Sequence, residues 1–337
     1  ASSAAWARLA SWADTPLAGC LSLVHVANSR YAISNRNGIA ADTGELLLRN
    51  APHASSLDAV ADGLSGMGTR IVIDATASEE VAERHAQWLA GGIHVVTACK
   101  LGQGASLSRW RAIQSARERG GTRYGDSATV GAGLPVLRSL RELQDGGDRI
   151  HAIAGVLSGS LAWLFNRYDG LRPFSGFVRA ARDAGYTEPD PRDDLSGEDV
   201  RRKLLILSRA AGHPLEADAV QVESLVPDAL AALAKDDVDA ALPTLDAPLR
   251  ERYAAAYKNG VKLRFIARLQ AGGLATVGLE ALAAEHPLAG GAGTDNRVAI
   301  WSDRYREQPL VIQGPGAGAE VTAAALLDDA LRIAREA

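Results

Sequence analysis

The sequence has few cysteines, no large excess of one charge and no targeting segment at its start. Cys20 and Cys99 are the only cysteines among 337 residues, too few for the disulfide framework of a small secreted protein. Lysine and arginine number 36 against 40 aspartate and glutamate residues, which does not favour binding to nucleic acid. The opening residues contain no charged stretch followed by an apolar run and a cleavage site. We therefore expect a cytoplasmic protein with neither nucleic-acid nor membrane partners.

The length of the chain predicts two domains. A chain of 337 residues exceeds the size at which a single hydrophobic core usually stops growing. Hydrophobic residues make up 47% and charged residues 23%, values typical of a soluble enzyme. From the patterns below we place a dinucleotide-binding domain at residues 1–133 plus 315–337, and a substrate-binding and dimerisation domain at residues 134–314.

The first half of the sequence alternates short β-branched runs with longer, alanine-rich helical patterns. Three runs read as strands, at residues 21–27, 70–76 and 93–97. Strands that alternate with helices predict an α/β fold with a parallel sheet covered on both faces, here a Rossmann-type domain. Such a domain opens with a strand and a glycine-rich turn, but residues 1–6 are helical in character. The first strand and the phosphate loop are thus absent from this sequence.

The second half has a different order of elements. A strand at 150–157 is followed by helical patterns from 161 to 256, after which residues 261–269 alternate apolar and mostly polar positions. Period-two alternation predicts a half-buried strand. Further strands are expected at 275–279, 298–301 and 310–313. Because no long helix separates these strands, we expect an α+β domain with an antiparallel sheet.

Glycines at 314–318 precede the last predicted helix, at 320–335. A strand, glycines and a helix are the parts of a dinucleotide-binding fingerprint, but no strand follows this helix, as a βαβ unit would require. Two interpretations stay open. The segment is either a flexible turn that starts the helix or a loop whose main-chain N–H groups approach a ligand.

A capping-box pattern marks the start of a helix near residue 197. Ser196 stands three residues before Asp199 and just ahead of an apolar-periodic run. Asp199 and Lys203 are one turn apart on a face that borders the buried side of this helix. Burial or a nearby cation can lower the pKa of a lysine in such a place. A surface ion pair, with Asp199 also capping the helix, is the alternative.

Several acids precede this helix on a stretch stiffened by Pro189 and Pro191. They are Glu188, Asp190, Asp193 and Asp194. Carboxylates on such a loop can receive an ammonium group. A metal site is a competing interpretation, although no histidine lies within the cluster, and a solvated acidic loop is the third.

The segment GYTEPDPRDDLSGEDVRRKLLIL, at 185–207, closely resembles the signature segment of homoserine dehydrogenases, especially of bifunctional aspartokinase/homoserine dehydrogenases. Five further segments match the family in its order: VIDATASEE (72–80), HVVTACK (94–100), TVGAGLPVL (129–137), GVLSGSLAWLF (155–165) and GPGAGAEVTAA (314–324). The resemblance spans nearly the whole chain. It implies an NAD(P)-dependent oxidoreductase that interconverts L-homoserine and L-aspartate 4-semialdehyde in threonine and methionine biosynthesis.

The resemblance implies roles for individual residues. Lys203 matches the family's catalytic lysine, and Lys100 matches its second active-site lysine. Independently of the family, Lys100 follows the strand at 93–97, and doubly wound sheets place their sites at the carboxyl ends of strands. The residues that match substrate-binding positions are Glu188 for the amino group, Asp199 for the reacting hydroxyl, Asp194 in support, and Gly159, Ser160 and Tyr186.

The cofactor is expected to be NADP, with NAD tolerated. Thr76, Lys100, Gly316 and Gly318 match positions near the nicotinamide. After the strand that ends at Ala27, Asn28-Ser29-Arg30 follows without the acid that grips the ribose of NAD. Arg30 can instead pair with a 2′-phosphate, although a plain surface role fits equally well.

The family also binds a monovalent cation, sodium or potassium, mainly through backbone carbonyls. Val130 and Ala132 match those positions. The chain departs from many relatives at Ser127, where they carry an acid and where Asp126 is one place away. It departs again at Cys99, where relatives commonly carry asparagine.

The alternating strands from 261 to 313 offer one face to the substrate-binding domain, and their other face, if apolar, needs a partner, so we expect a symmetric homodimer. The resemblance allows fusion to an upstream aspartokinase domain. The missing phosphate loop suggests an alternative function: a catalytically weak regulatory or scaffold module inside such a bifunctional polypeptide. The combination of Lys100, Lys203, Glu188 and Asp199 argues against this alternative, because a module without catalysis has no need for these groups together.

Overall fold

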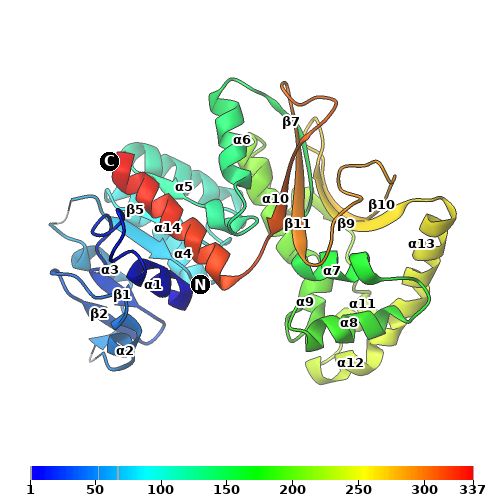
Figure 1. The fold of residues 1–337 in the computed structure, drawn as a ribbon, viewed down its shortest axis with the longest axis horizontal. Helices are drawn as coiled ribbons and strands as arrows, with labels where there is room; N and C mark the ends of the chain where they lie inside the picture. The colour runs from blue at the N-terminus through cyan, green and yellow to red at the C-terminus, as the bar shows by residue number, and fades with distance from the viewer. Residues whose placement is uncertain (1, 52, 67, 337) are drawn as a thin grey trace. The chain divides into compact units, whose positions relative to one another are not determined.

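The structure is a computed structural model that describes residues 2–51, 53–66 and 68–336. The chain forms two compact units. Unit 1 comprises the described residues up to Gly133 together with those from Ala317 onward, and unit 2 comprises Leu134–Gly316. Figure 1 shows unit 1 in blue and cyan with the red C-terminal helix, and unit 2 in green to orange.

Unit 1 contains six α-helices and six strands among its described residues. The helices are α1 (Ser2–Ala10), α2 (Gly44–Arg49), α3 (Asp58–Gly63), α4 (Glu79–Ala90), α5 (Leu107–Gly120) and α14 (Ala319–Glu336). The strands are β1 (His25–Ala27), β2 (Tyr31–Ser34), β3 (His53–Ala54), β4 (Ile71–Asp74), β5 (His94–Thr97) and β6 (Tyr124–Gly125).

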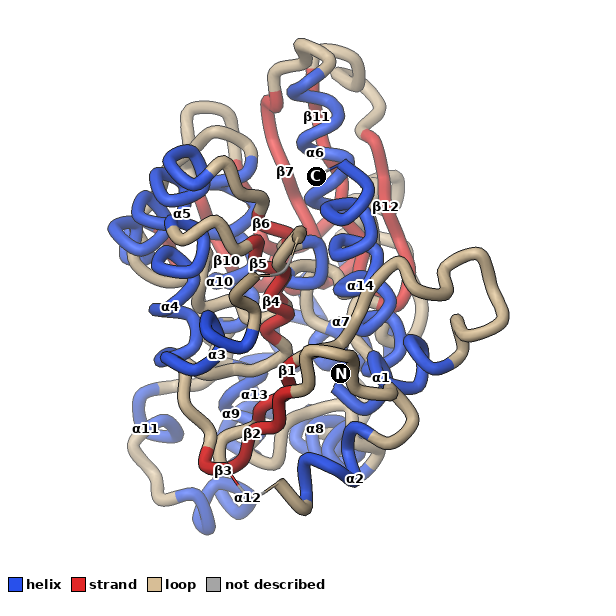
Figure 2. The backbone as a smooth tube through the Cα atoms, turned by 90° about the vertical axis from the view of Figure 1, so that its left-hand side faces the viewer, coloured by secondary structure: helices blue, strands red, loops and turns tan. Residues whose placement is uncertain are grey.

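A parallel sheet of three strands, in the order β4-β5-β6, is the centre of unit 1 (Figure 2). Helices cover both of its faces. On one face Trp88 and Leu89 of α4 pack with Ile113 of α5 against Val95. On the other face α14 packs its apolar stripe against Val96. The α/β class expected from the alternating pattern is confirmed.

The predicted strand at 21–27 is wrong in extent and in partner. Only His25–Ala27 is a strand, and it pairs antiparallel with β2 in a separate sheet, in the order β1-β2-β3. The cause is local. The Asn28 side-chain oxygen accepts hydrogen bonds from the backbone N–H groups of Arg30 and Tyr31, both at 2.8 Å. Asparagine favours such turns, so the chain reverses at once into a hairpin.

Unit 2 is built around one mixed sheet. Its strands are β7 (Ile150–Val156), β8 (Val220–Val222), β9 (Lys262–Leu269), β10 (Ala275–Leu282), β11 (Asp295–Ser302) and β12 (Leu310–Pro315). Its α-helices are α6 (Val136–Asp145), α7 (Gly159–Arg167), α8 (Phe174–Asp183), α9 (Pro191–Leu195), α10 (Glu198–Ala210), α11 (Asp228–Ala231), α12 (Val238–Ala241) and α13 (Asp246–Lys258).

The strand order of this sheet is β12-β11-β7-β9-β10-β8. All neighbours pair antiparallel except β8 and β10, which run parallel. β8 lies in the stretch expected to be helical, and its three residues are too few for a sequence pattern to reveal. The longer strands expected after residue 260 are present and antiparallel.

Among the described residues, every helix is too short or too polar to cross a lipid bilayer.

Candidate active site

Two candidate site residues of unit 1 follow neighbouring parallel strands. Thr76 comes two residues after the end of β4, and Lys100 comes three residues after the end of β5. Their strands pair directly, with Asp74 opposite Thr97. Carboxyl ends of adjacent parallel strands lie at one edge of the sheet, so the structure places both residues at the same edge of unit 1.

A buried hydrogen-bond network holds this sheet edge. His85 of α4 is fully buried, and its Nε2 lies 3.0 Å from Asp74 Oδ2 while its Nδ1 lies 2.9 Å from the Tyr124 hydroxyl. The Thr97 hydroxyl donates to the same Asp74 oxygen at 3.2 Å. The carboxylate therefore ties the ends of β4 and β5 to α4, and His85 extends the link to β6.

The pKa of Asp74 reflects two opposing causes. Burial, the largest effect, disfavours the charged carboxylate, but hydrogen bonds from His85 and from Thr76 favour it and hold the pKa below its ordinary value. The Thr76 N–H donates to Asp74 Oδ1 at 2.9 Å. The same charged group thus stabilises the sheet edge and orients the backbone of the Thr76 segment.

Gly102 lets the turn that carries Lys100 approach this network. A Cβ atom at residue 102 would lie 2.3 Å from the Tyr124 hydroxyl and 3.0 Å from His85 Nδ1. No larger residue fits there without displacing either the turn or the Tyr124 and His85 side chains. The turn is closed by a hydrogen bond from the Gly104 N–H to the Lys100 carbonyl, 2.6 Å.

Asn28 and Arg30 lie in the β1–β2 hairpin, and both are exposed. The Asn28 side chain serves the turn, as described above. The backbone carbonyl of Arg30 accepts a hydrogen bond from the Ser55 N–H at 2.9 Å. An exposed arginine on a short, fixed turn can pair with a phosphate group.

The segment that carries Val130 and Ala132 is buried and has an unusual backbone. Val130 is fully buried and Ala132 is 6% exposed. Gly131 has φ 76° and Ala132 has φ 50°, the latter being the one positive value recorded for a residue other than glycine in the described chain. Alanine pays for this left-handed conformation with backbone strain. Val130 and Ala132, which match the family's cation positions, therefore lie in a buried segment whose backbone departs from regular helix and strand.

In unit 2, Lys203 is held by two oxygen atoms. Its Nζ lies 2.8 Å from Asp199 Oδ2 and donates to the Leu157 carbonyl at 2.8 Å. The Lys203 side chain is 12% exposed, whereas that of Asp199 is 46% exposed. The pair is therefore not a solvent-exposed surface ion pair. The lysine is largely buried, whereas the aspartate is partly exposed to water.

The predicted capping box at Ser196 is wrong. Helix α10 begins at Glu198, and its N-cap is Gly197, whose φ of 78° is left-handed. Ser196 instead ends the short helix α9, and its hydroxyl donates to the Asp193 carbonyl at 3.0 Å. Two helices meet at this glycine, because only a residue without Cβ turns so sharply at little cost.

Asp194 connects two other candidate residues of unit 2. The Ser160 hydroxyl donates to Asp194 Oδ1 at 2.6 Å, and the Glu188 N–H donates to Asp194 Oδ2 at 2.8 Å. The pKa of Asp194 is raised, mainly by burial of its carboxyl group and to a smaller extent by the negative charge of Asp199. The Glu188 side chain itself is exposed, so its carboxylate is presented to a ligand while its backbone is fixed.

The other members of the acidic loop have different roles. Asp190 caps α9 and pairs with Arg192 at 2.7 Å. Arg192 in turn donates to the Leu233 carbonyl at 2.7 Å. Among the described residues, no group of three or more histidine, cysteine, aspartate or glutamate side chains is placed to bind a metal.

Gly159 and Tyr186 complete the substrate positions. Gly159 is the first residue of α7, whose N-cap Ser158 accepts from the Leu161 N–H at 3.2 Å. A Cβ atom at residue 159 would lie 3.2 Å from the Thr294 carbonyl. Tyr186 is 46% exposed, and its ring centre lies 5.5 Å from that of Trp163.

The glycines after β12 differ in their setting. Gly316 packs flat against Asn296, since a Cβ there would lie 2.0 Å from Asn296 Cγ. Gly318 has φ 131° and precedes α14. The close packing against Asn296 is a sufficient reason for glycine at position 316, whether or not the loop also binds a ligand.

Sequence reasoning missed Asp74, His85, Tyr124 and Asn296. Asp74 carried a weak signal, as an acid that ends an apolar strand. His85 lies within an amphipathic helix, and Asn296 lies before the predicted start of its strand at residue 298, so neither stood out.

Two family models match the chain. Residues 135–331 match the model described as homoserine dehydrogenase, and residues 6–125 match that of the homoserine dehydrogenase NAD-binding domain. Together they span both units.

Curated relatives agree with these matches. The chain is 45% identical over 265 residues to bifunctional aspartokinase/homoserine dehydrogenase 2 of Escherichia coli, covering 79% of this chain and 33% of that protein. It is 39% identical over 289 residues to a homoserine dehydrogenase of Schizosaccharomyces pombe, covering 83% of this chain and 77% of that protein. The chain thus spans about a third of the length of the bifunctional relatives it matches.

Solved structures share the fold. A Candida auris protein of unknown function has a TM-score of 0.91 at 34% identity, with 99% of this chain and 95% of that one covered. A hyperthermophilic archaeal homoserine dehydrogenase in complex with NADPH has a TM-score of 0.74 at 19% identity, with 99% and 94% covered. With a family model that matches more than half of its residues, the chain belongs to the homoserine dehydrogenase family.

Proposed function

We propose that this protein catalyses the NADP-dependent interconversion of L-homoserine and L-aspartate 4-semialdehyde. The observation that carries the proposal is the setting of Lys203 in unit 2: a withdrawn ammonium held between Asp199 and the Leu157 carbonyl, close in sequence to the Glu188–Asp194 pair. These groups provide proton transfer and ammonium recognition, which are what homoserine oxidation demands of a protein.

The chemistry assigned to the side chains is acid–base catalysis. When homoserine is oxidised, Lys203 in its neutral form takes the proton of the hydroxyl group. A nicotinamide cofactor, when bound, would supply the acceptor for the hydride. In the reverse direction the Lys203 ammonium stabilises and protonates the oxygen that gains negative charge. Asp199 orients the lysine and the reacting hydroxyl. The exposed Glu188 carboxylate binds the amino group of the substrate, with Asp194 fixing its backbone. Lys100, together with Thr76, Gly316 and Gly318, serves the cofactor end.

The test is an absorbance assay at the reduced-nicotinamide band with purified protein that includes any upstream sequence. We expect homoserine-dependent reduction of NADP. A folded preparation that shows no such signal with NADP or NAD would favour the alternative, a catalytically weak regulatory or scaffold module.

The preference for NADP is supported by the exposed Arg30 on its fixed turn. Arg30→Ala should raise the KM for NADP and leave the KM for NAD unchanged, because only NADP carries the 2′-phosphate. If the KM values for NADP and NAD changed equally, Arg30 would be a surface residue that does not bind the 2′-phosphate.

A monovalent cation at Val130 and Ala132 is the second cofactor we propose. The left-handed backbone at residues 131 and 132 supports it. Activity should then rise when sodium or potassium replaces a large organic cation at constant ionic strength. An activity that is the same in all three salts would contradict the site.

A homodimer is supported by the sheet of unit 2. Val311 is 37% exposed and Trp301 is half-buried. Val311 pairs with Ala299, and Trp301 follows Ala299 by two residues in β11, so Val311 and Trp301 lie on the same face of the sheet. Apolar side chains on a sheet face favour burial against a second copy. Light scattering at micromolar concentration should give the mass of a dimer, and a monomer would overturn this.

Fusion to an upstream aspartokinase is supported by the bifunctional names of the E. coli and plant relatives, whereas the S. pombe relative is named as a homoserine dehydrogenase alone. Sequencing the gene upstream of this segment would decide. The cytoplasmic location stays a prediction, to be tested by fractionation of cells.

A further inference from the structure

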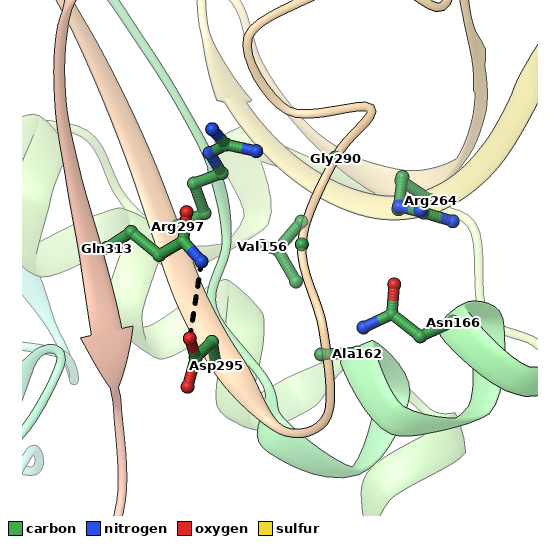
Figure 3. A pocket seen from close by; sticks show the side chains of 9 residues that line it. Val156, Ala162, Asn166, Arg264, Gly290, Asp295, Arg297 and Gln313 are labelled. Carbon is green, nitrogen blue, oxygen red and sulfur yellow. Dashed lines mark hydrogen bonds between the residues drawn. The ribbon is translucent and has the colours of Figure 1, made fainter.

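Asn296 is a polar residue in the interior of unit 2. It lies in β11 and is 1% exposed. Its neighbours Asp295 and Arg297 line a small cavity of about 10 Å³, where Gln313 donates to Asp295 (Figure 3). Successive residues of a strand point to opposite faces. Asn296 therefore points away from that cavity, toward the segment that follows β7.

The Asn296 amide shares its acceptor with the candidate catalytic lysine. Its Nδ2 donates to the Leu157 carbonyl at 3.2 Å, and Lys203 Nζ donates to the same oxygen at 2.8 Å. A carbonyl oxygen has two lone pairs, so these two donors use its full capacity. The pairing of Arg297 with Val156 puts Asn296 beside Leu157.

In this orientation the oxygen of the Asn296 amide makes no hydrogen bond within the described residues. Asn296 Oδ1 is buried and has no hydrogen-bond partner among the described residues. A buried acceptor without a partner destabilises the fold. The backbone of Gly316 packs against the amide so closely that a Cβ atom would lie 2.5 Å from Oδ1. In this orientation Nδ2 meets the Leu157 carbonyl, and Oδ1 lies against the backbone of Gly316.

We propose that Asn296 is a positioning residue for Lys203, acting through the Leu157 carbonyl. The amide fixes the direction of that carbonyl and occupies one of its lone pairs, which leaves a single defined place for the lysine nitrogen opposite Asp199. The inference rests on the proposed function, because it gives Asn296 a role only if Lys203 transfers the proton.

The test uses two variants of the whole protein. Asn296→Ala removes the donor, and the isosteric Asn296→Asp removes it at a pH at which its carboxyl is ionised, while keeping the packing against Gly316. Asn166→Ala is the matched control, since Asn166 Nδ2 also donates to a backbone carbonyl of unit 2, that of Gly293 at 3.1 Å. For each protein, kcat and KM for homoserine, the pH profile of kcat/KM and the melting temperature are measured.

We expect kcat to fall by about 10-fold or more in both variants with little change in KM, because misplacement of an acid–base group acts mainly on the transition state. The acid limb of the pH profile should move to higher pH. Without the amide, the Leu157 carbonyl interacts with the ammonium alone, and in Asn296→Asp a nearby carboxylate adds to this effect. The move should be larger for aspartate than for alanine and absent in the Asn166→Ala control.

A purely structural Asn296 would lower the melting temperature and leave kcat and the pH profile unchanged, and that result would overturn the proposal. If Asn296→Ala fails to fold, the isosteric variant decides alone. A wild-type protein without homoserine-dependent activity would instead contradict the proposed function.

Discussion

Lys203 shows why spacing alone could not separate a catalytic lysine from a surface ion pair. Residues four apart on a helix lie side by side whether or not the pair is buried. The decisive contact is made by Leu157, 46 positions earlier in the chain, and no local pattern encodes it. The family resemblance suggested the catalytic role of Lys203, and the structure identifies Asp199 and the Leu157 carbonyl as the groups that hold its nitrogen.

Replacing Lys203 with alanine should lower kcat by roughly 10²-fold or more, the lower range for loss of a positioned acid or base. An alanine side chain can neither accept nor donate a proton, so it cannot replace the nitrogen that contacts Asp199 and the Leu157 carbonyl. Steady-state kinetics of homoserine oxidation measure this. Lys258→Ala is the control, because Lys258 is exposed at the end of α13. Wild-type kcat in the Lys203 variant would transfer the catalytic role to Lys100.

Glu188→Gln should mainly raise the KM for homoserine. The exposed carboxylate loses its charge, and the ammonium contact weakens equally in the ground state and the transition state. The backbone bond from Glu188 to Asp194 does not depend on this side chain, so the melting temperature should stay the same. Glu285→Gln, on an exposed loop, is the matched control. A fall in kcat at unchanged KM would exclude ammonium binding as the role of Glu188.

Asp74 should make unit 1 sensitive to acid. Its pKa in the folded protein lies below the ordinary value of 3.8, so its ionised form stabilises the fold. That contribution is complete above about pH 4 and is lost as the pH falls through the lowered folded pKa. Asp74→Asn should therefore be less stable near neutral pH by about 1–3 kcal/mol, and its stability should fall less on acidification. Urea unfolding between neutral pH and pH 3 measures both, with Asp62→Asn, an exposed acid, as control. Parallel pH dependences of the variant and the wild type would contradict this role.

At the scale of elements, periodicity predicted what is long and regular. The strands of unit 2 after residue 260 and the final helix are present close to the expected bounds. The errors lie at short turns. A hairpin closed by the Asn28 side chain redirected the first strand, and a left-handed Gly197 replaced the expected cap. In both places one residue's local hydrogen bonding or backbone freedom outweighs the pattern around it.

Helix α14 should be essential to unit 1 and not to unit 2. Leu326 is fully buried and packs in the cluster that includes Val96 of β5. Leu326→Ala should cost about 2–5 kcal/mol, the range for a large-to-small change in a core. Hydrogen exchange should accelerate in β4, β5 and β6 as well as in α14. Leu171→Ala, at a position 85% exposed, should leave exchange unchanged. Faster exchange confined to α14 itself would show that the helix is an appendage.

For the whole molecule, the fold class could be predicted because alternating strands and helices allow few architectures. The pairing of strands far apart in sequence could not. The order β12-β11-β7-β9 brings residue 156 beside residue 297, and Asn296 acquires its contact with Leu157 only through that pairing. The His85 network likewise depends on three strand ends meeting one helix. Such sites follow from long-range packing, which a single sequence does not reveal.

The return of the chain to unit 1 has a consequence for synthesis on the ribosome. Within this chain, the residues of unit 1 up to Gly133 are made before unit 2, and α14 is made after it. Until then Val96 and Ala128, which α14 buries, lack their cover. At about 5–20 residues per second, translation of the intervening unit 2 leaves this apolar surface exposed for some ten seconds or longer. The nascent chain therefore exposes an apolar surface to which ribosome-associated chaperones can bind, and the nucleotide-binding unit completes its core only after unit 2 has been made.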